Sequence, residues 1–148
     1  MTFEQFVNER GPGLRAALIA AYGPEVGLDA ASEALAFGWE QWPRLSAMDN
    51  PAGYLFRVGQ TEARRLTRVA PSFPAPPQHA LPDFEPGLLP ALSSISEQQR
   101  VCVLLVHAFG WPIVEVAQFL DISHSTARTH LMRGLQHLRS LMEVDRAD

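Results

Sequence analysis

The stretch Ile113–Leu138, IVEVAQFLDISHSTARTHLMRGLQHL, decides how the C-terminal part of this chain folds. Two short runs with the apolar spacing of amphipathic helices meet at Asp121-Ile122-Ser123. Ser123 stands directly before the second run, where its hydroxyl can accept a backbone N–H of the first helical turn. The pattern predicts a helix-turn-helix, a motif that places its second helix in the major groove of DNA.

The second run has two different faces. Its apolar residues recur at the spacing of one buried stripe, and they are Ala127, Leu131, Leu135 and Leu138. The opposite face carries hydroxyl, guanidinium and imidazole groups, from His124, Ser125, Thr126, Arg128, Thr129, His130 and Arg133. Arginine can bind guanine or phosphate with two hydrogen bonds, and Ser or Thr can donate to either. We therefore predict that this face contacts DNA. The alternative is a plain helical hairpin whose arginines are solvated.

The first run has its own apolar spacing. Val114, Ala117 and Leu120 are expected on the buried side, where Ala117 is small enough to let the second helix approach. Glu115 and Gln118 should then lie in solvent. A further helix is expected upstream of this pair, because Ser96-Glu97-Gln98-Gln99 has the form of a capping box.

The composition is that of a folded protein. Of the 148 residues, 47% are hydrophobic and 19% are charged, which favours a globular chain of one ordinary domain or two small ones. No apolar run approaches the ~20 residues of a membrane span, and no secretory signal pattern is present. We expect a cytoplasmic protein without a membrane partner. The lone thiol of Cys102, set among apolar residues, is expected to be a small core residue.

The net charge of −4 bears on which partners the chain can bind. A protein that holds DNA alone usually has a strongly basic surface, because phosphates dominate the binding free energy. The net negative charge therefore weakens the interpretation that this chain is a repressor that binds DNA by itself.

A proline-rich stretch divides the chain. Seven prolines lie between residues 70 and 90, at positions 71, 74, 76, 77, 82, 86 and 90. Such density is incompatible with helix interiors and sheet ladders, so the stretch is expected to be a linker, either solvated or docked on a groove. The predicted fold is all-α, with two small helical domains joined by this linker. The predicted boundaries are 1–69 for the first domain, 70–91 for the linker, 92–142 for the second domain and 143–148 for a tail.

The N-terminal half has helical periodicity throughout. Thr2 and Gln5 can form a capping box, and Gly23-Pro24 is expected to separate the first helix from the second. Asn50 is expected to cap a third helix with Pro51 at its first position, where a missing N–H costs nothing.

Aromatic and basic residues also occur together in this half. The arginines that follow Tyr54 and Phe56 would suit a contact with single-stranded nucleic acid by charge and stacking. The alternative is that these aromatic residues are core residues, and this alternative is favoured for Phe56, Trp39 and Trp42.

Two stretches resemble conserved regions of the extracytoplasmic-function (ECF) sigma factors of bacterial RNA polymerase. Residues 92–142, LSSISEQQRVCVLLVHAFGWPIVEVAQFLDISHSTARTHLMRGLQHLRSLM, resemble the fourth region of that family. Residues 37–68, FGWEQWPRLSAMDNPAGYLFRVGQTEARRLTR, resemble the end of the second region, in which two spaced tryptophans precede N-P-x-x-[WY]-L-x-R-[VI] and an arginine-rich tail. The order of helical domain, linker and helical domain is also that of the family.

The resemblance implies a set of partners and contact residues. Core RNA polymerase, double-stranded promoter DNA, the melted non-template strand and an anti-sigma factor are the expected partners, and no catalytic residue, cofactor or metal is expected. The DNA face of the second helix would read the upstream, minus-35 element. The residues expected near the melted downstream DNA are Arg57, Arg64, Arg65 and Arg68. Those expected to bind polymerase are Asp29, Glu33, Trp39 and Trp42.

The chain also departs from the family pattern. The acidic clamp-binding run of the family is reduced at residues 27–34 to GLDAASEA, and Gln60 replaces the usual asparagine. His130 stands where many relatives carry a basic residue, and would contact a phosphate when protonated unless it is an ordinary packed or solvated histidine.

Two other functions fit parts of the sequence. A dimeric helix-turn-helix regulator would bind a palindrome without polymerase. A sigma-like interaction protein that does not initiate transcription would fit the reduced acidic run. An enzyme is not expected, because the sequence has no paired carboxylates, activated nucleophile, phosphate loop or metal-ligand cluster.

Overall fold

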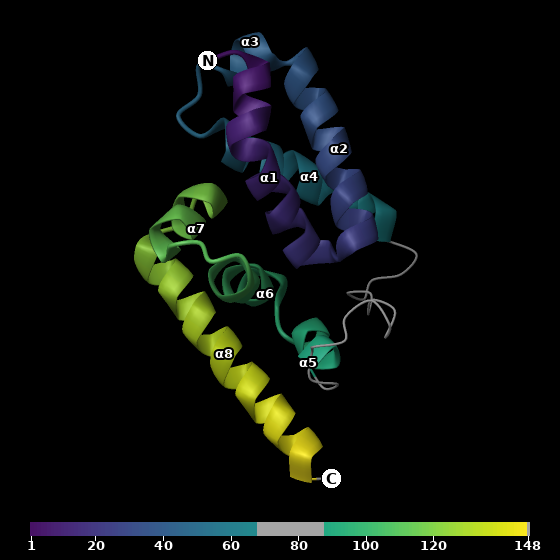
Figure 1. Ribbon diagram of the computed structural model, residues 1–148, viewed down its shortest axis with the longest axis vertical. Coiled ribbons are helices and arrows are strands. Elements are labelled where there is room, and N and C mark those ends of the chain that lie inside the picture. The colour runs from purple at the N-terminus through teal and green to yellow at the C-terminus, as the bar shows by residue number, and fades with distance from the viewer. Residues whose placement is uncertain (68–87, 148) are drawn as a thin grey trace.

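The computed structural model describes residues 1–67 and 88–147, and every regular element in those two ranges is a helix. The first group consists of α1 (Phe3–Tyr22), α2 (Pro24–Glu40), α3 (Trp42–Leu45) and α4 (Pro51–Leu66). The second group consists of α5 (Leu88–Ser94), α6 (Glu97–Val103), the short π-helix η3 (Leu104–Ala108), α7 (Ile113–Leu120) and α8 (His124–Ala147). The two groups lie at opposite ends of the molecule, and α8 extends away from the first group toward the C-terminus (Figure 1). The all-α prediction is confirmed. Neither range holds a helix long and apolar enough to cross a bilayer.

Local signals set the helix ends of the first group. The Thr2 hydroxyl accepts the backbone N–H of Gln5, whose side chain accepts the Thr2 N–H, as the capping box predicts. Gly23, at φ 89°, ends α1, and Pro24 starts α2. The Asn50 side chain accepts the backbone N–H of Gly53 at 2.9 Å and so caps α4. These predictions are confirmed.

The contact between α1 and α2 is made by small residues. A Cβ atom at Gly27 would lie 2.6 Å from the Cα atom of Ile19, so the two backbones approach as closely as a glycine allows. The other α2 residues buried against this core are Ala30, Ala31, Ala34 and Gly38. The small residues of the run at 27–34 therefore have a packing role.

The second group has a smaller core between α5, α6 and α8. Leu138 is buried there, and Ala127 is buried nearer the start of α8. Leu131 and Leu135 are partly buried and pack against buried residues, so the predicted stripe of α8 is confirmed. The predicted stripe of α7 is wrong at Val114, which is 51% exposed. Because α7 packs against both α4 and α8, it buries a wider face, formed by Val116, Ala117, Phe119 and Leu120.

Two predicted boundaries differ from the structure. Most of the predicted linker, residues 70–87, lies outside the described residues, but its last residues belong to α5. Pro90 is the third residue of that helix, where a backbone N–H has no helical acceptor in any case. At the other end α8 continues to Ala147, so the predicted tail 143–148 is mostly helix.

Cys102 has no exposed surface, as predicted, and its burial raises the pKa of the thiol to about 11. We expect the native thiol to react with a disulfide reagent at pH 8 about 100-fold more slowly than the thiol of the unfolded chain, because only the thiolate reacts. The reagent releases an aromatic thiol when it reacts, and the absorbance of that product measures both rates. A Ser140→Cys, Cys102→Ser variant places the thiol on an exposed position of α8 and is expected to react fast without denaturant. Equal rates for the native wild type and this control would contradict the burial of Cys102.

Candidate nucleic-acid interface

The turn of the helix-turn-helix is formed by three residues between α7 and α8. Asp121 has left-handed backbone angles, φ 57° and ψ 47°, which aspartate tolerates better than most residues, and it ends α7. The N–H of Ile122 then donates to the carbonyl of Ala117 at 3.0 Å. Ser123 accepts the backbone N–H of Thr126 at 3.0 Å and starts α8, as predicted. Hydrogen bonds therefore hold the turn both at the end of α7 and at the start of α8.

The predicted DNA face of α8 lies at the surface. Its exposed residues are His124, Ser125, Thr126, Arg128 and Arg133. Thr129 and His130 are half-buried, and the Thr129 hydroxyl donates to the carbonyl of Ser125 at 2.9 Å. Within the described residues Arg128 and Arg133 have no ion pair, so their guanidinium groups are available to a ligand.

The arginines predicted to approach downstream DNA have carboxylate neighbours. Arg57 on α4 forms an ion pair with Asp121 of the turn at 2.9 Å, and Arg64 lies 3.9 Å from Glu97 of α6. Arg65 pairs with Glu62 on its own helix. Arg68 lies outside the described residues. No sequence pattern indicated the pairs with Asp121 and Glu97, because they join residues 64 and 33 positions apart.

The aromatic residues of the first group have different surroundings. Phe56 is a core residue, 2% exposed, as the favoured interpretation predicts. Trp42 is half-buried against the ring of Phe6, 5.0 Å away between centroids, and its indole N–H donates to the carbonyl of Met1. The core interpretation is wrong for Trp39, which is 64% exposed and touches Phe3 only edge to face.

On α2, the predicted polymerase-binding acids Asp29 and Glu33 are exposed. They lie on a side of the helix that faces away from the core, because Ala30 and Ala31 between them are buried. Leu28 is also exposed beside them. The structure thus presents two carboxylates and one apolar side chain on this face of α2.

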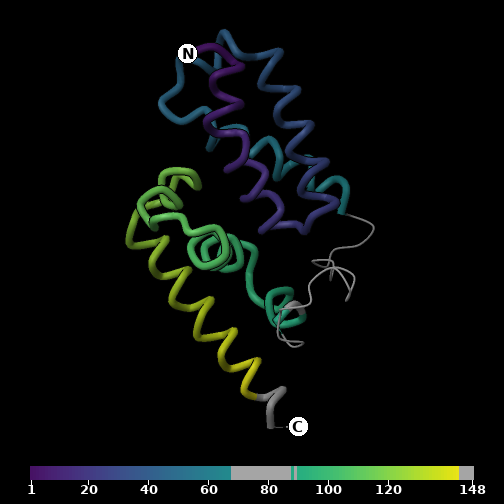
Figure 2. The backbone as a smooth tube through the Cα atoms, in the orientation of Figure 1, coloured from purple at the N-terminus to yellow at the C-terminus, as the bar shows by residue number. Residues whose placement is uncertain are grey.

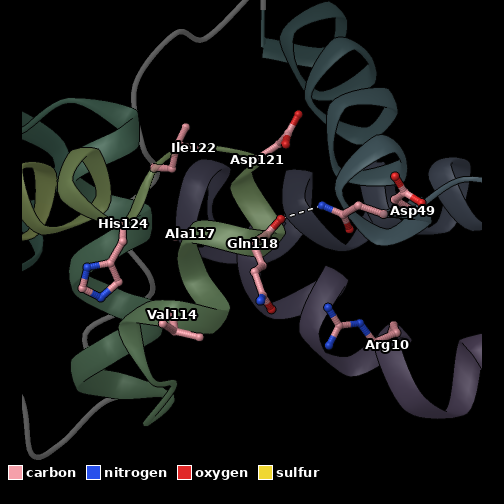
Figure 3. Close-up of a pocket in the computed structure, with 9 residues that line it drawn as sticks. Arg10, Asp49, Val114, Ala117, Gln118, Asp121, Ile122 and His124 are labelled. Atoms are coloured by element: carbon pink, nitrogen blue, oxygen red, sulfur yellow. Dashed lines mark hydrogen bonds between the residues drawn. The ribbon is translucent and has the colours of Figure 1, made fainter.

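A cavity of about 650 Å³ lies where the helix-turn-helix meets the first group of helices (Figure 3). The first group contributes Arg10, Asp49 and Asn50, and the second contributes Val114, Ala117, Gln118, Asp121, Ile122 and His124. The Asn50 side chain donates to the carbonyl of Gln118 at 2.5 Å and joins the two walls. No sequence pattern pointed to this cavity, because its walls come from segments far apart in the chain. Among the described residues no cluster of side chains has the composition of a metal site.

Comparison with known proteins finds one family model and several solved structures that match this chain. Residues 88–138 match the family model described as sigma-70, region 4. A solved structure of the sigma factor RpoE from Bartonella quintana, in a co-crystal with the anti-sigma factor NepR, is similar over 97% of this chain and 98% of that chain, with a TM-score of 0.62 and 21% sequence identity. No curated protein matches the sequence. The region 4 match covers α5 to most of α8, and the structural match extends the likeness to both groups of helices. The family match supports the predicted resemblance to sigma factors over residues 88–138, and the structural match shows the same fold over both groups of helices.

Proposed function

We propose that this chain, which has the region 4 domain and the fold of an ECF-type sigma factor, binds core RNA polymerase and directs it to promoter DNA. It would act as a non-enzymatic initiation factor in the cytoplasm. The observation that carries the proposal is the region 4 match over residues 88–138. That segment contains the helix-turn-helix whose exposed arginines have no ion pair among the described residues.

The upstream, minus-35 element is the proposed ligand of α8. An α-helix with its side chains is about 10–12 Å across, and the major groove of DNA is about 12 Å wide. The exposed Ser125, Thr126 and Arg128 lie in the first turns of α8, the part of a recognition helix that meets base edges. Arg133 lies further along the helix and suits a base or a phosphate.

The first group of helices is the proposed site for polymerase and for the melted strand. Asp29 and Glu33 on the exposed face of α2 would meet a basic surface of the polymerase, with Trp39 adding apolar area. The α4 arginines would meet the non-template strand. A polymerase partner also explains how a chain with net negative charge could bind promoter DNA. Contacts with polymerase would supply binding free energy that DNA contacts alone would otherwise have to supply.

An anti-sigma factor is a further proposed partner. The similar RpoE structure contains one, and the present chain has the same fold over nearly its whole length. Such a partner would compete with polymerase for exposed surfaces of both groups of helices.

In vitro transcription tests the proposal. Purified chain, core polymerase and a DNA fragment from upstream of its own gene are expected to give a run-off product of defined length. A sample without the chain is the control. A dimer of the chain that binds a palindrome in the same fragment, with no run-off product, would instead identify a stand-alone regulator. Polymerase binding without a product would identify a sigma-like interaction protein.

A further inference from the structure

One large apolar side chain stands within the exposed polar face of α8. Met132 is 59% exposed, although its neighbours on this face carry hydroxyl and guanidinium groups. Figure 2 shows α8 along the edge of the molecule, with α5 and α6 packed on one side of it only. Met132 belongs to the side that these helices leave open, so packing within the described residues does not account for a methionine at this position.

The period of the helix places Met132 in the middle of this face. At 3.6 residues per turn, residues spaced by four, three and four positions follow one line along a helix. On α8 that line is formed by Ser125, Thr129, Met132 and Gln136. Arg128 lies on one side of the line and Arg133 on the other, and neither has an ion pair in the described parts of the chain. Their guanidinium groups can therefore bind the phosphates that border a groove, while Met132 meets the base edges between them.

The neighbour of Met132 on this line has little polar capacity left. The Thr129 hydroxyl donates its proton to the carbonyl of Ser125 at 2.9 Å, so this proton is not available to a base. Thr129 and Met132, three positions apart, are neighbours on the helix surface and together offer methyl and thioether groups. In the major groove only thymine presents a methyl group, and the other base edges present hydrogen-bond donors and acceptors. An unbranched, polarisable methionine side chain can adjust its shape to such a methyl group.

We propose that Met132 is a specificity-determining residue, which reads the C5-methyl group of a thymine in the upstream promoter element. This inference rests on the proposed function and adds an apolar base contact to the polar ones of α8. Burial of one methyl group changes a binding constant about fourfold. Arg128 and Arg133 hold the helix in the groove, and Met132 distinguishes a pair that contains thymine from one that contains cytosine at one position.

Replacement of thymine by uracil tests this contact, because it removes the methyl group and keeps every hydrogen bond of the base pair. The sample is the holoenzyme of the full chain and core polymerase, on the promoter fragment with each upstream thymine replaced in turn. The wild-type holoenzyme is expected to bind about fourfold more weakly when one particular thymine is replaced. The Met132→Gln holoenzyme, which has a polar side chain of similar length, is expected to bind the thymine and uracil fragments equally well.

Two further variants separate this effect from a change in fold. Met132→Leu keeps an apolar side chain and is expected to restore most of the preference for thymine. Val114→Ala is the matched control, because it shortens an apolar side chain of similar exposure, 51%, on α7. It should keep the wild-type ratio of thymine to uracil affinity. Circular dichroism should show the same helix content in all of these variants, since glutamine and leucine favour helix about as strongly as methionine does.

Each of the other results decides against the proposal or against the function on which it rests. A wild-type holoenzyme that binds every uracil fragment as tightly as the unmodified one would overturn the role of Met132. A Met132→Gln holoenzyme with the wild-type preference would do the same, because another residue then reads the methyl group. If no run-off product forms but the chain alone binds the fragment, the proposed function fails, and the same uracil series with the chain alone decides the role of Met132. A chain that binds no fragment, with or without polymerase, overturns both.

Discussion

Replacing Arg128 or Arg133 by alanine is expected to weaken binding to the upstream promoter element by about 1–3 kcal/mol if the side chain reads a base. Both guanidinium groups are exposed on α8 and have no ion pair in the described parts of the chain, so their removal should leave the fold intact. Fluorescence anisotropy with a labelled promoter duplex, at several salt concentrations, measures the affinity.

Salt dependence separates the two kinds of contact. A residue that binds phosphate should weaken binding equally on all sequences and reduce the salt slope by about one, whereas a base contact should relax specificity at one position. Arg139→Ala is the matched control, because it removes the same charge from an exposed position further along α8. If neither Arg128→Ala nor Arg133→Ala binds more weakly than this control, the DNA face has been assigned wrongly.

Replacing Gly27 by alanine is expected to destabilise the fold by about 2 kcal/mol. This is a net value, because overpacking outweighs the gain in helix propensity of about 1 kcal/mol. The added Cβ atom would lie 2.6 Å from the Cα atom of Ile19 and 2.7 Å from the carbonyl oxygen of Leu18. These are backbone atoms, so α1 and α2 must separate to make room. The melting temperature should fall by about 4–8 °C.

Thermal unfolding followed by circular dichroism measures this change. Ser32→Ala is the control, because it improves helix propensity at an exposed position of α2 without a new contact. It should melt at or slightly above the wild-type temperature. A Gly27→Ala variant that melts as high as this control would show that α1 and α2 are less closely packed than the structure has them.

Signals that act within one helical turn were predicted correctly. The caps by Thr2, Asn50, Ser96 and Ser123 all form, because each joins a side chain to an N–H three residues away and needs no other part of the chain. The buried stripe of α8 was also predictable from its period. For the same reason most of the exposed face of α8 could be read directly from its residues, although Thr129 and His130 are half-buried.

Features that depend on neighbouring helices were not predictable. Val114 has the spacing of a buried residue, but α7 packs on two sides and buries Val116 and Phe119. Trp39 has helical spacing with Trp42, yet only Trp42 meets the core. Pro90 looked like part of a linker, although it lies in the first turn of α5, where its missing N–H is not needed.

The sequence by itself determined the helices, their caps, the helix-turn-helix and the resemblance to sigma factors, because periodicity and capping are properties of adjacent residues. Only the tertiary structure decided which charges face one another. Arg57 and Arg64 look like free DNA ligands in the sequence, but they lie against Asp121 and Glu97 once the two groups of helices pack. The physical reason is that Phe56, Trp111 and Phe119 bury apolar surface together, and this long-range contact brings α4 and the second group of helices side by side.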